Sequence, residues 1–309
     1  MVPVTETMLD TYDHADFPAN EISARLPGPV SVVIPTRNTA GTIAQTVGEL
    51  RVLADGGIVS QILVVDADSG DGTAAAARDA GAEVVSENEL MPEYGPVLGK
   101  GDAMWRAMDA VNGEVVVYVD GDIADFGRHY VTGLLGPLCA DPAKKFVKGC
   151  YRRPFRQDTT EQPAGGGRVT ELTARPLLAR TVPELVQFEQ PLAGEIAAHR
   201  SLLESVPFCT GYGVEIAMLV QVWDRVGLDG MAQVGLGTKR NAHQSLDALG
   251  GMASEVIDAL AAVLDGLGRE DLGSIGSAPG TARRPVTRPA RAGLADCGSV
   301  RARLGPTGR

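Results

Sequence analysis

The chain has 309 residues and an apolar fraction of 44%, enough for a large core in one domain or two closely packed ones. Its formal net charge of −11 argues against nucleic-acid binding, because nucleic-acid binders concentrate positive charge on their surface. No uncharged apolar stretch has transmembrane length, and the first residues lack the basic and apolar blocks of a signal peptide, so we expect a cytoplasmic protein without membrane attachment.

Alternating strands and helices are predicted for the first half of the chain. Residues 1–29 show no sustained period, and we expect a lead-in segment that packs on the body. From residue 30, β-branched runs alternate with stretches of helical period, which is typical of a mainly parallel α/β sheet. The predicted strands cover residues 30–34, 62–65, 83–85 and 115–119, and the predicted helices cover 42–54, 73–80 and 99–111. Residues 30–145 therefore form the first predicted unit.

The alternation changes after residue 145. Here we predict a strand at 146–149 and helices at 182–192, 193–203 and 213–226. An apolar stripe from Leu246 to Val263 predicts a later helix that either packs inside the chain or pairs two chains. Residues 146–267 form the second predicted unit.

The end of the chain, residues 268–309, is rich in Gly, Pro, Ser and Arg. Such a composition buries too little apolar surface to order itself, so we expect a disordered tail. Its arginines are expected to be solvated rather than to form a binding arm.

Three polar clusters follow predicted strands, at residues 35–38, 66–69 and 120–122. Ligands of an open parallel sheet bind outside the carboxyl ends of its strands, so we expect the clusters to meet at one edge. Asp120 and Asp122 offer hard oxygen ligands to Mg²⁺ or Mn²⁺, and Gly121 permits close backbone approach. An acidic turn that caps a helix is the alternative.

Two further polar residues are candidates for the same site. Asp66 either caps a turn or accepts hydrogen bonds from a base or ribose. Lys100 stands at a predicted helix start, where backbone donors also point outward, so it either contacts a diphosphate or is an ordinary exposed lysine.

Several segments resemble the GT-A glycosyltransferases. They are VVIP at 32–35, VDADSGDGT at 65–73, GKGDAMW at 99–105 and VDGD at 119–122. With FEQPL at 188–192 and GYGVE at 211–215, the chain is similar more narrowly to the actinobacterial glucosyl-3-phosphoglycerate synthases, over about residues 15–265. The last two segments are the more specific ones.

This resemblance implies a GT-A fold and retaining transfer of glucose from UDP-glucose to the 2-hydroxyl of 3-phosphoglycerate, with Mg²⁺ (or Mn²⁺) and as a homodimer. Nucleotide-sugar contacts are implied for Pro35, Asp66, Lys100, Asp120, Gly121 and Tyr212, and acceptor contacts for Gly167, Arg168 and Thr170 within residues 146–267. Metal ligation is implied for Asp120, Asp122 and His243, and catalytic roles for Lys100, Asp122, Leu192 and Glu215. The Leu192 carbonyl would lie near the anomeric carbon.

Some of these roles have alternatives. The stretch 165–170 suits an anionic acceptor because it offers backbone N–H groups and an arginine, yet a flexible surface loop would have the same composition. His243 is either a metal ligand or a structural histidine, and Glu215 is either a site residue or a first-turn charge. Two departures from the family pattern, Thr39 after Asn38 and Asn241 before Ala242, leave the donor open.

Expulsion of a nucleotide diphosphate develops negative charge, which a cation and Lys100 would stabilise. No carboxylate is singled out for a double displacement, so we expect same-face attack by the acceptor hydroxyl. A mannosyl-3-phosphoglycerate synthase using GDP-mannose is the nearest alternative. A polyprenyl-phosphate glycosyltransferase and a non-catalytic nucleotide-sugar sensor are two others.

Overall fold

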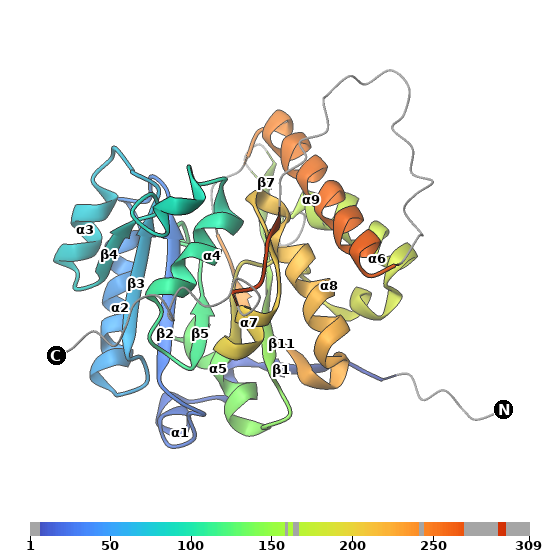
Figure 1. Cartoon of the computed structure of the whole chain (residues 1–309). Coiled ribbons are helices and arrows are strands. Elements are labelled where there is room, and N and C mark those ends of the chain that lie inside the picture. The colour runs from blue at the N-terminus through green and yellow to red at the C-terminus, as the bar shows by residue number, and fades with distance from the viewer. Residues whose placement is uncertain (1–6, 158–159, 163–166, 241–243, 269–289, 295–309) are drawn as a thin grey trace.

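The computed structural model describes residues 7–157, 160–162, 167–240, 244–268 and 290–294, and these are built around an eight-stranded sheet (Figure 1). The strand order is β1-β11-β6-β9-β5-β2-β3-β4. Neighbouring strands are parallel except at β9, which runs antiparallel to both β5 and β6. The strands are β1 Asp10–Asp13, β2 Val30–Thr36, β3 Gln61–Asp66, β4 Glu83–Ser86, β5 Val115–Tyr118, β6 Phe146–Arg152, β9 Ile196–His199 and β11 Met231–Thr238.

Helices cover both faces of the sheet (Figure 1), because successive residues of a strand point to opposite sides. Val64 and Val117 pack on one face with α1, α2, α3 and α5, whereas Leu63 and Val116 pack on the other with α4 and α6 to α9. The helices are α1 Ala19–Ser23, α2 Ile43–Asp55, α3 Thr73–Asp79, α4 Lys100–Ala110, α5 His129–Ala140, α6 Arg175–Thr181, α7 Arg200–Ser205, α8 Val214–Val226 and α9 Leu246–Gly266.

The mainly parallel α/β architecture is therefore confirmed, and its strands come from both sides of residue 145. The lead-in segment contributes β1, which pairs in parallel with β11 at the edge of the sheet. None of the helices in the described ranges combines the length and apolarity that crossing a membrane requires.

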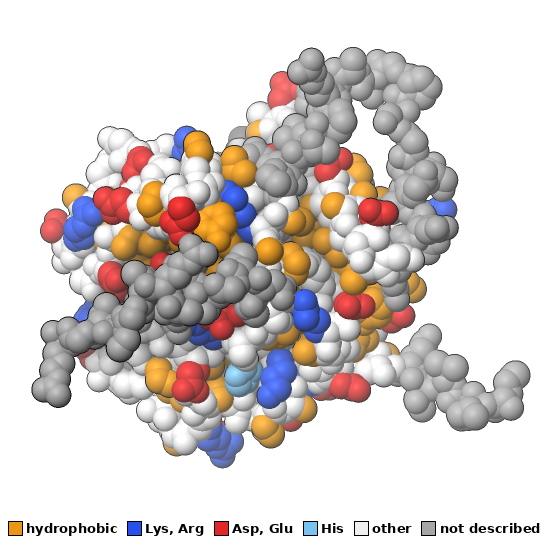
Figure 2. Space-filling model, in the orientation of Figure 1, with side chains coloured by type: hydrophobic (Ala, Val, Ile, Leu, Met, Phe, Trp, Pro, Cys, Tyr) orange, Lys and Arg blue, Asp and Glu red, His pale blue; other side chains and the backbone are white. Residues whose placement is uncertain are grey.

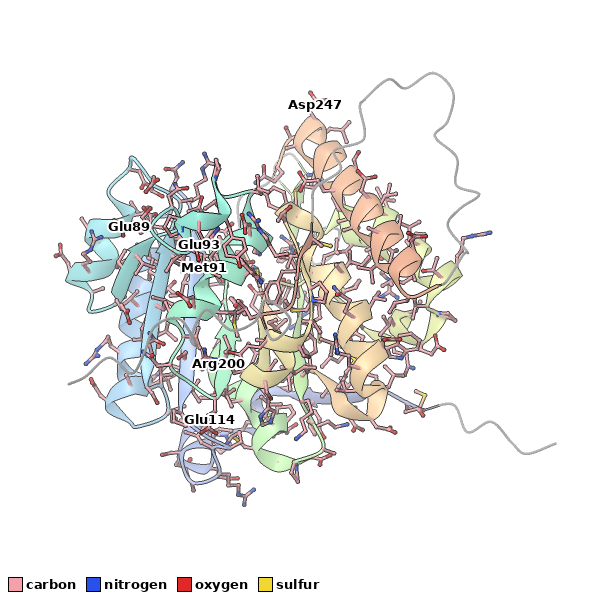
Figure 3. The ribbon with its side chains drawn as sticks, in the orientation of Figure 1. Glu89, Met91, Glu93, Glu114, Arg200 and Asp247 are labelled. Carbon is pink, nitrogen blue, oxygen red and sulfur yellow. The ribbon has the colours of Figure 1, made fainter. Side chains whose placement is uncertain are left out.

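Two predicted helices are wrong. Residues 193–203 form β9 followed by the short α7, although Ala-rich sequences favour helix. Within β9, Ala197 packs on one face of the sheet and Ile196 and Ala198 on the other, so burial on both faces outweighs local propensity. The turn into α7 is anchored where the Arg200 N–H donates to the Glu114 carbonyl at 2.8 Å (Figure 3).

The helix predicted over residues 182–192 is also wrong. There the chain makes only a 3₁₀ turn, Pro183–Gln187. Both Pro183 and Pro191 lie inside this stretch. Pro183 suits the first turn of a helix, whereas Pro191 lacks the N–H that a helix continuing to residue 192 would need.

The apolar stripe on α9 packs inside the chain. Val256 and Leu260 are buried in the same cluster as α8, and Leu249, Met252 and Val263 are partly buried against it. Leu246, at the first turn, is 80% exposed. Of the two alternatives for this helix, intramolecular packing accounts for most of the stripe.

Candidate active site

The carboxyl ends of β2, β3 and β5 bring the three polar clusters together, as predicted. Thr36 is paired with Asp66 across β2 and β3, and the Thr42 hydroxyl donates to the Gly121 carbonyl at 2.7 Å. A Cβ at Gly121 would lie 2.7 Å from the Thr36 hydroxyl oxygen, which explains why glycine occupies the centre of the Asp-Gly-Asp turn.

Five charged side chains, here called the ionic cluster, form the centre of this edge. Asp120 accepts from the ammonium groups of Lys100 at 2.7 Å and Lys239 at 2.6 Å. Lys100 also pairs with Glu215 at 2.8 Å, and Lys239 with Glu195 at 2.5 Å. The cluster joins the start of α4, the end of β5, the loop before β9, the first turn of α8 and the end of β11.

Burial and pairing oppose each other in the pKa values of this cluster. Burial favours neutral Lys100, but Asp120 and Glu215 outweigh it and raise the pKa of Lys100 well above its ordinary value. Burial likewise raises the pKa of Asp120, but Lys100 and Lys239 hold that pKa well below its usual range. The pKa of Glu195 is raised, because burial exceeds the effect of Lys239. The pairs therefore keep Asp120 ionised although its side chain is only 22% exposed.

Two ammonium groups face three carboxylates in the ionic cluster, so its net charge is negative when all five are ionised. Lys148 on β6 adds a third ammonium group next to them, and the exposed Asp122 adds a fourth carboxylate. The edge as a whole therefore has one more carboxylate than ammonium groups, which disfavours an anionic ligand.

A sixth charged side chain, the buried Lys148 of β6, lies next to the ionic cluster. The Lys148 ammonium donates to the Ala193 carbonyl at 2.7 Å, and burial lowers the pKa of Lys148 to about 8 despite the nearby Glu215 and Glu195. Because Ala193 follows Leu192, Lys148 helps to hold the loop that carries the predicted catalytic carbonyl.

Lys148→Met is expected to remove a pH-dependent destabilisation. The folded pKa lies below the ordinary value of 10.5, so the unfolded chain binds more protons between about pH 8 and 10.5. The free-energy cost to folding of burying the charged Lys148 is fully present below about pH 8, where it amounts to at most about 3 kcal/mol. It disappears towards pH 10.5. Urea unfolding at several pH values checks this. The variant's unfolding free energy relative to the wild type should fall as pH rises, and a pH-independent difference would contradict it.

The loop from Gln190 to Glu195 lies directly on the ionic cluster. A Cβ at Gly194 would lie 2.6 Å from an Asp120 carboxylate oxygen and 2.8 Å from the Lys100 ammonium. The absence of a side chain at Gly194 thus lets the loop approach the charged pair, and Leu192, two residues earlier, is partly buried against the core.

The predicted nucleotide end contains a buried acceptor. Asp66 is 5% exposed; one carboxylate oxygen accepts from the Ser69 N–H at 2.9 Å, and the other has no hydrogen-bond partner among the described residues. Pro35 pairs with Val65 in the neighbouring strand, which places it beside Asp66. An unsatisfied buried oxygen is costly unless a ligand donates to it.

The predicted acceptor residues lie at the start of a helical segment, which includes the π-helix Thr170–Ala174 and reaches the site through Gln190. Gly167 has a φ of +76°, and a Cβ there would lie 3.8 Å from the Gln190 side-chain oxygen. Thr170 is buried, whereas Arg168 donates to the Gln244 carbonyl at 3.0 Å. Tyr212 is half exposed, and its N–H donates to Glu255 of α9 at 2.7 Å.

The predicted metal ligands differ in their surroundings. Asp122 is exposed and has no recorded partner in the described part of the chain, whereas both oxygens of Asp120 are occupied by lysines. His243 lies outside the described residues. Arg240 pairs with Asp125 at 3.2 Å, and its carbonyl accepts from the Ala124 N–H, so the chain leaves residue 240 beside the Asp122 turn.

Within the described ranges, no group of three or more His, Cys, Asp or Glu side chains is arranged to hold a metal. Asp122 suits a hard cation that takes its remaining oxygens from a ligand or water, since Mg²⁺ commonly uses one or two carboxylates together with phosphates.

Three residues of the site were not predicted: Lys148, Glu195 and Lys239. Lys148 had a sequence signal, because it is a charged residue inside the apolar run Phe146 to Cys150. Glu195 and Lys239 had no such signal in the sequence, because their partners are distant along the chain.

Figure 2 shows acidic and basic side chains interspersed over the visible face, rather than a continuous basic surface.

Comparison with known proteins agrees with this geometry. The model of "Glycosyl transferase family 2" matches residues 31–189. A glucosyl-3-phosphoglycerate synthase from Mycolicibacterium smegmatis is 46% identical over 75% of this chain and 76% of its own length. The crystal structure of a mannosyl-3-phosphoglycerate synthase from Rubrobacter xylanophilus has a TM-score of 0.83 and 42% identity, over 93% of this chain and 96% of that one.

A glucosyl-3-phosphoglycerate synthase from Mycobacterium tuberculosis, solved with Mn²⁺, UDP-glucose and phosphoglyceric acid, has a TM-score of 0.81 and 38% identity. That comparison covers 94% of this chain and 100% of the other. The chain belongs to the glucosyl-3-phosphoglycerate synthases and, by its amino-terminal half, to glycosyl transferase family 2.

Proposed function

We propose that this protein transfers glucose from UDP-glucose to the 2-hydroxyl group of 3-phosphoglycerate, with retention of configuration. The observation that carries the proposal is the presence of three groups at one sheet edge. They are a buried Asp66 oxygen that has no hydrogen-bond partner among the described residues, the ammonium of Lys100 and the exposed carboxylate of Asp122. The M. tuberculosis relative solved with UDP-glucose, Mn²⁺ and phosphoglyceric acid supports this choice of ligands.

The nucleotide would bind at the Asp66 end. The unpaired Asp66 oxygen suits a hydrogen-bond donor of the base or ribose, and a bound ligand would offset a desolvation cost of about 1–3 kcal/mol. Pro35 and Gly121 would lie along the nucleotide, and the diphosphate would extend towards Lys100.

We propose Mg²⁺ or Mn²⁺ as cofactor, because Asp122 adds a fourth carboxylate at this edge and a cation there would offset negative charge towards a diphosphate. Asp122 would hold it, with His243 as a further ligand, while a direct role for Asp120 requires release of Lys100 or Lys239. When bound, the cation stabilises negative charge on the departing diphosphate. Lys100 contributes a second positive charge to the same leaving group.

We propose same-face attack by the acceptor hydroxyl. Glu195 and Glu215 are both held by lysine ammonium groups, which weakens either one as a nucleophile. The Leu192 carbonyl would face the reacting carbon, and Glu215 would order the sugar. A sugar ester on the enzyme, trapped and found by mass spectrometry, would contradict this step.

The acceptor would bind where the start of the helical segment at 167–170 adjoins Gln190. Gly167 has a positive φ of +76°, and backbone N–H groups in such a conformation can bind an anion, while the Arg168 guanidinium can pair with a carboxylate or phosphate. Since Gln190 precedes Leu192 by two residues, an acceptor bound there would lie next to the predicted sugar position.

A mannosyl-3-phosphoglycerate synthase is the second candidate, because the R. xylanophilus structure of that name is also similar along nearly the whole chain. Turnover with UDP-glucose, GDP-glucose and GDP-mannose separates the two. We expect UDP-glucose to give the highest kcat/KM with 3-phosphoglycerate. A higher value with GDP-mannose would favour the second candidate, and nucleotide release independent of 3-phosphoglycerate would contradict both.

We further propose a homodimer in the cytoplasm. The dimer rests on the family resemblance, and light scattering tests it. The location rests on the substrates, which are charged metabolites that do not cross a membrane unaided. Cell fractionation tests it.

A further inference from the structure

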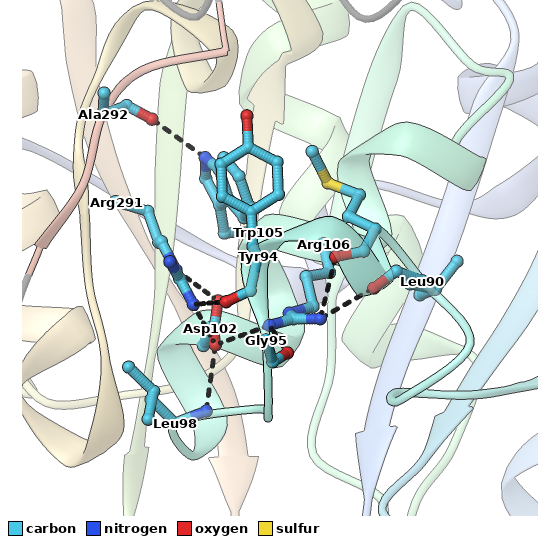
Figure 4. Close-up of polar contacts among 10 residues, drawn as sticks. Leu90, Tyr94, Gly95, Leu98, Asp102, Trp105, Arg106, Arg291 and Ala292 are labelled. Carbon is cyan, nitrogen blue, oxygen red and sulfur yellow. Dashed lines mark hydrogen bonds and ion pairs between the residues drawn. The ribbon is translucent and has the colours of Figure 1, made fainter.

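A short C-terminal segment, Ala290–Leu294, packs on the outside of α4 although the sequence predicted a solvated tail. Its first two residues form β12, Ala290–Arg291, which pairs antiparallel with β10, Phe208–Cys209. Figure 4 shows Arg291 reaching a buried group of polar side chains on α4. The expectation that the tail arginines are solvated is wrong for Arg291.

Arg291 makes a two-pronged ion pair with Asp102, which is fully buried in the first turn of α4. Its Nε lies 2.9 Å from one carboxylate oxygen and an Nη 3.0 Å from the other. The guanidinium also donates to the Tyr94 carbonyl at 3.2 Å and lies 5.5 Å and 5.6 Å from the ring centres of Tyr94 and Trp105. Paired donors and aromatic faces make this a specific arginine site.

The rest of the segment is anchored by contacts of other kinds. The Trp105 indole N–H donates to the Ala292 carbonyl at 2.9 Å. A Cβ at Gly293 would lie 2.9 Å from the Glu204 carbonyl oxygen, so backbone packs closely on backbone there. Leu294 is partly buried against the core.

These contacts join two parts of the chain that end in the ionic cluster. Asp102 stands two residues after Lys100 on α4, and β10 continues through Gly211–Gly213 into Glu215. Tyr94, in the connection between β4 and α4 that also carries Met91 and Glu93 (Figure 3), leads directly to Lys100. Lys100 and Glu215 meet at 2.8 Å.

We propose that residues Ala290–Leu294 form a strap that positions Lys100 against Glu215, with Arg291 as a positioning residue that touches no substrate. The effect on sugar transfer rests on the proposed function, whereas docking of the strap does not.

The folding of α4 does not require the strap, because Asp102 has other partners. Without Arg291, Asp102 keeps the Leu98 N–H at 2.9 Å and the buried Arg106 guanidinium at 3.4 Å. Arg106 is itself held by the carbonyls of Leu90, Met91 and Gly95 (Figure 4). Loss of Arg291 is therefore expected to loosen the approach to Lys100 while α4 stays folded.

The test uses the full chain with Arg291→Ala and Arg291→Lys, and Arg51→Ala as a control at an exposed pair with Asp55. Trp105→Phe is a milder variant that removes one strap hydrogen bond and keeps an aromatic ring. Amide hydrogen exchange of β10 and steady-state kinetics are measured well below the unfolding temperature. We expect faster exchange at β10 and a kcat lowered about 10-fold to 10²-fold in Arg291→Ala, partly restored in Arg291→Lys.

Unchanged exchange at β10 in Arg291→Ala and Trp105→Phe would overturn docking of the strap. Faster exchange with unchanged kcat and KM would overturn its positioning role and leave a contribution to stability alone. A wild-type protein that transfers no sugar would overturn the proposed function, while the exchange comparison would still decide whether the strap docks.

Discussion

Asp122→Ala is expected to lower kcat/KM for glucose transfer by at least about 10²-fold, because a cation that stabilises the leaving group contributes several kcal/mol to the transition state. Asp122 is the one carboxylate of the Asp-Gly-Asp turn that no lysine occupies in the described structure. Initial rates of UDP release, measured over a range of Mg²⁺ concentrations, check the prediction.

The same variant should leave the thermal unfolding midpoint nearly unchanged, since the Asp122 side chain is exposed and forms no hydrogen bond or ion pair with the described residues. Asp79→Ala, at the exposed end of α3, is the matched control and should affect neither rate nor stability. An Asp122→Ala protein that keeps the wild-type rate at low Mg²⁺ would exclude Asp122 as a metal ligand.

Lys239→Met is expected to destabilise the fold by about 3–5 kcal/mol, the cost of leaving a buried charge without its partner. Lys239 is 2% exposed and bridges Asp120 and the fully buried Glu195. Activity should fall as well, because Asp120 loses one of its two anchors. Urea unfolding gives the free energy, and Lys145→Met, whose ammonium donates to the exposed Pro142 carbonyl, is the control.

Glu195→Gln added to Lys239→Met should recover part of the lost stability, because the unpaired charge is then absent. In the single variant, the pKa of Glu195 should rise further than burial already raises it. A raised carboxyl pKa destabilises progressively as pH increases above the ordinary value, so Lys239→Met should be least destabilised in acid. The assigned role of the bridge would be refuted if the double variant were no more stable than Lys239→Met and if the loss of unfolding free energy in Lys239→Met did not change with pH.

The first half of the fold could be predicted because local pattern and tertiary position agree there. Strands β2, β3 and β5 are β-branched and buried on both faces, and the helices between them have a clear apolar side. The prediction fails at β9, where Ala197 and Ala198 favour helix locally but lie in the middle of the sheet. It also misses β11 and α5, whose positions depend on partners distant in sequence.

The candidate site could be predicted only where its residues stand at the ends of regular elements. Asp66, Lys100 and Asp120 follow or precede regular elements, so strand ends alone bring them to one edge. The counter-charges Glu195 and Lys239 could not be assigned, because each lies in a loop whose path is set by the sheet order. Arg291 was placed in a solvated tail, since composition does not reveal that one arginine finds a buried carboxylate.

Glucose transfer with and without a chelator tests the central claim most directly. Purified protein with UDP-glucose, 3-phosphoglycerate and Mg²⁺ should give a product heavier by one hexose together with equimolar UDP, as measured by mass spectrometry and chromatography. Excess chelator should abolish both, and added Mg²⁺ or Mn²⁺ should restore them. Product formed at the full rate in excess chelator would contradict a cation-dependent departure of the nucleotide at Asp122.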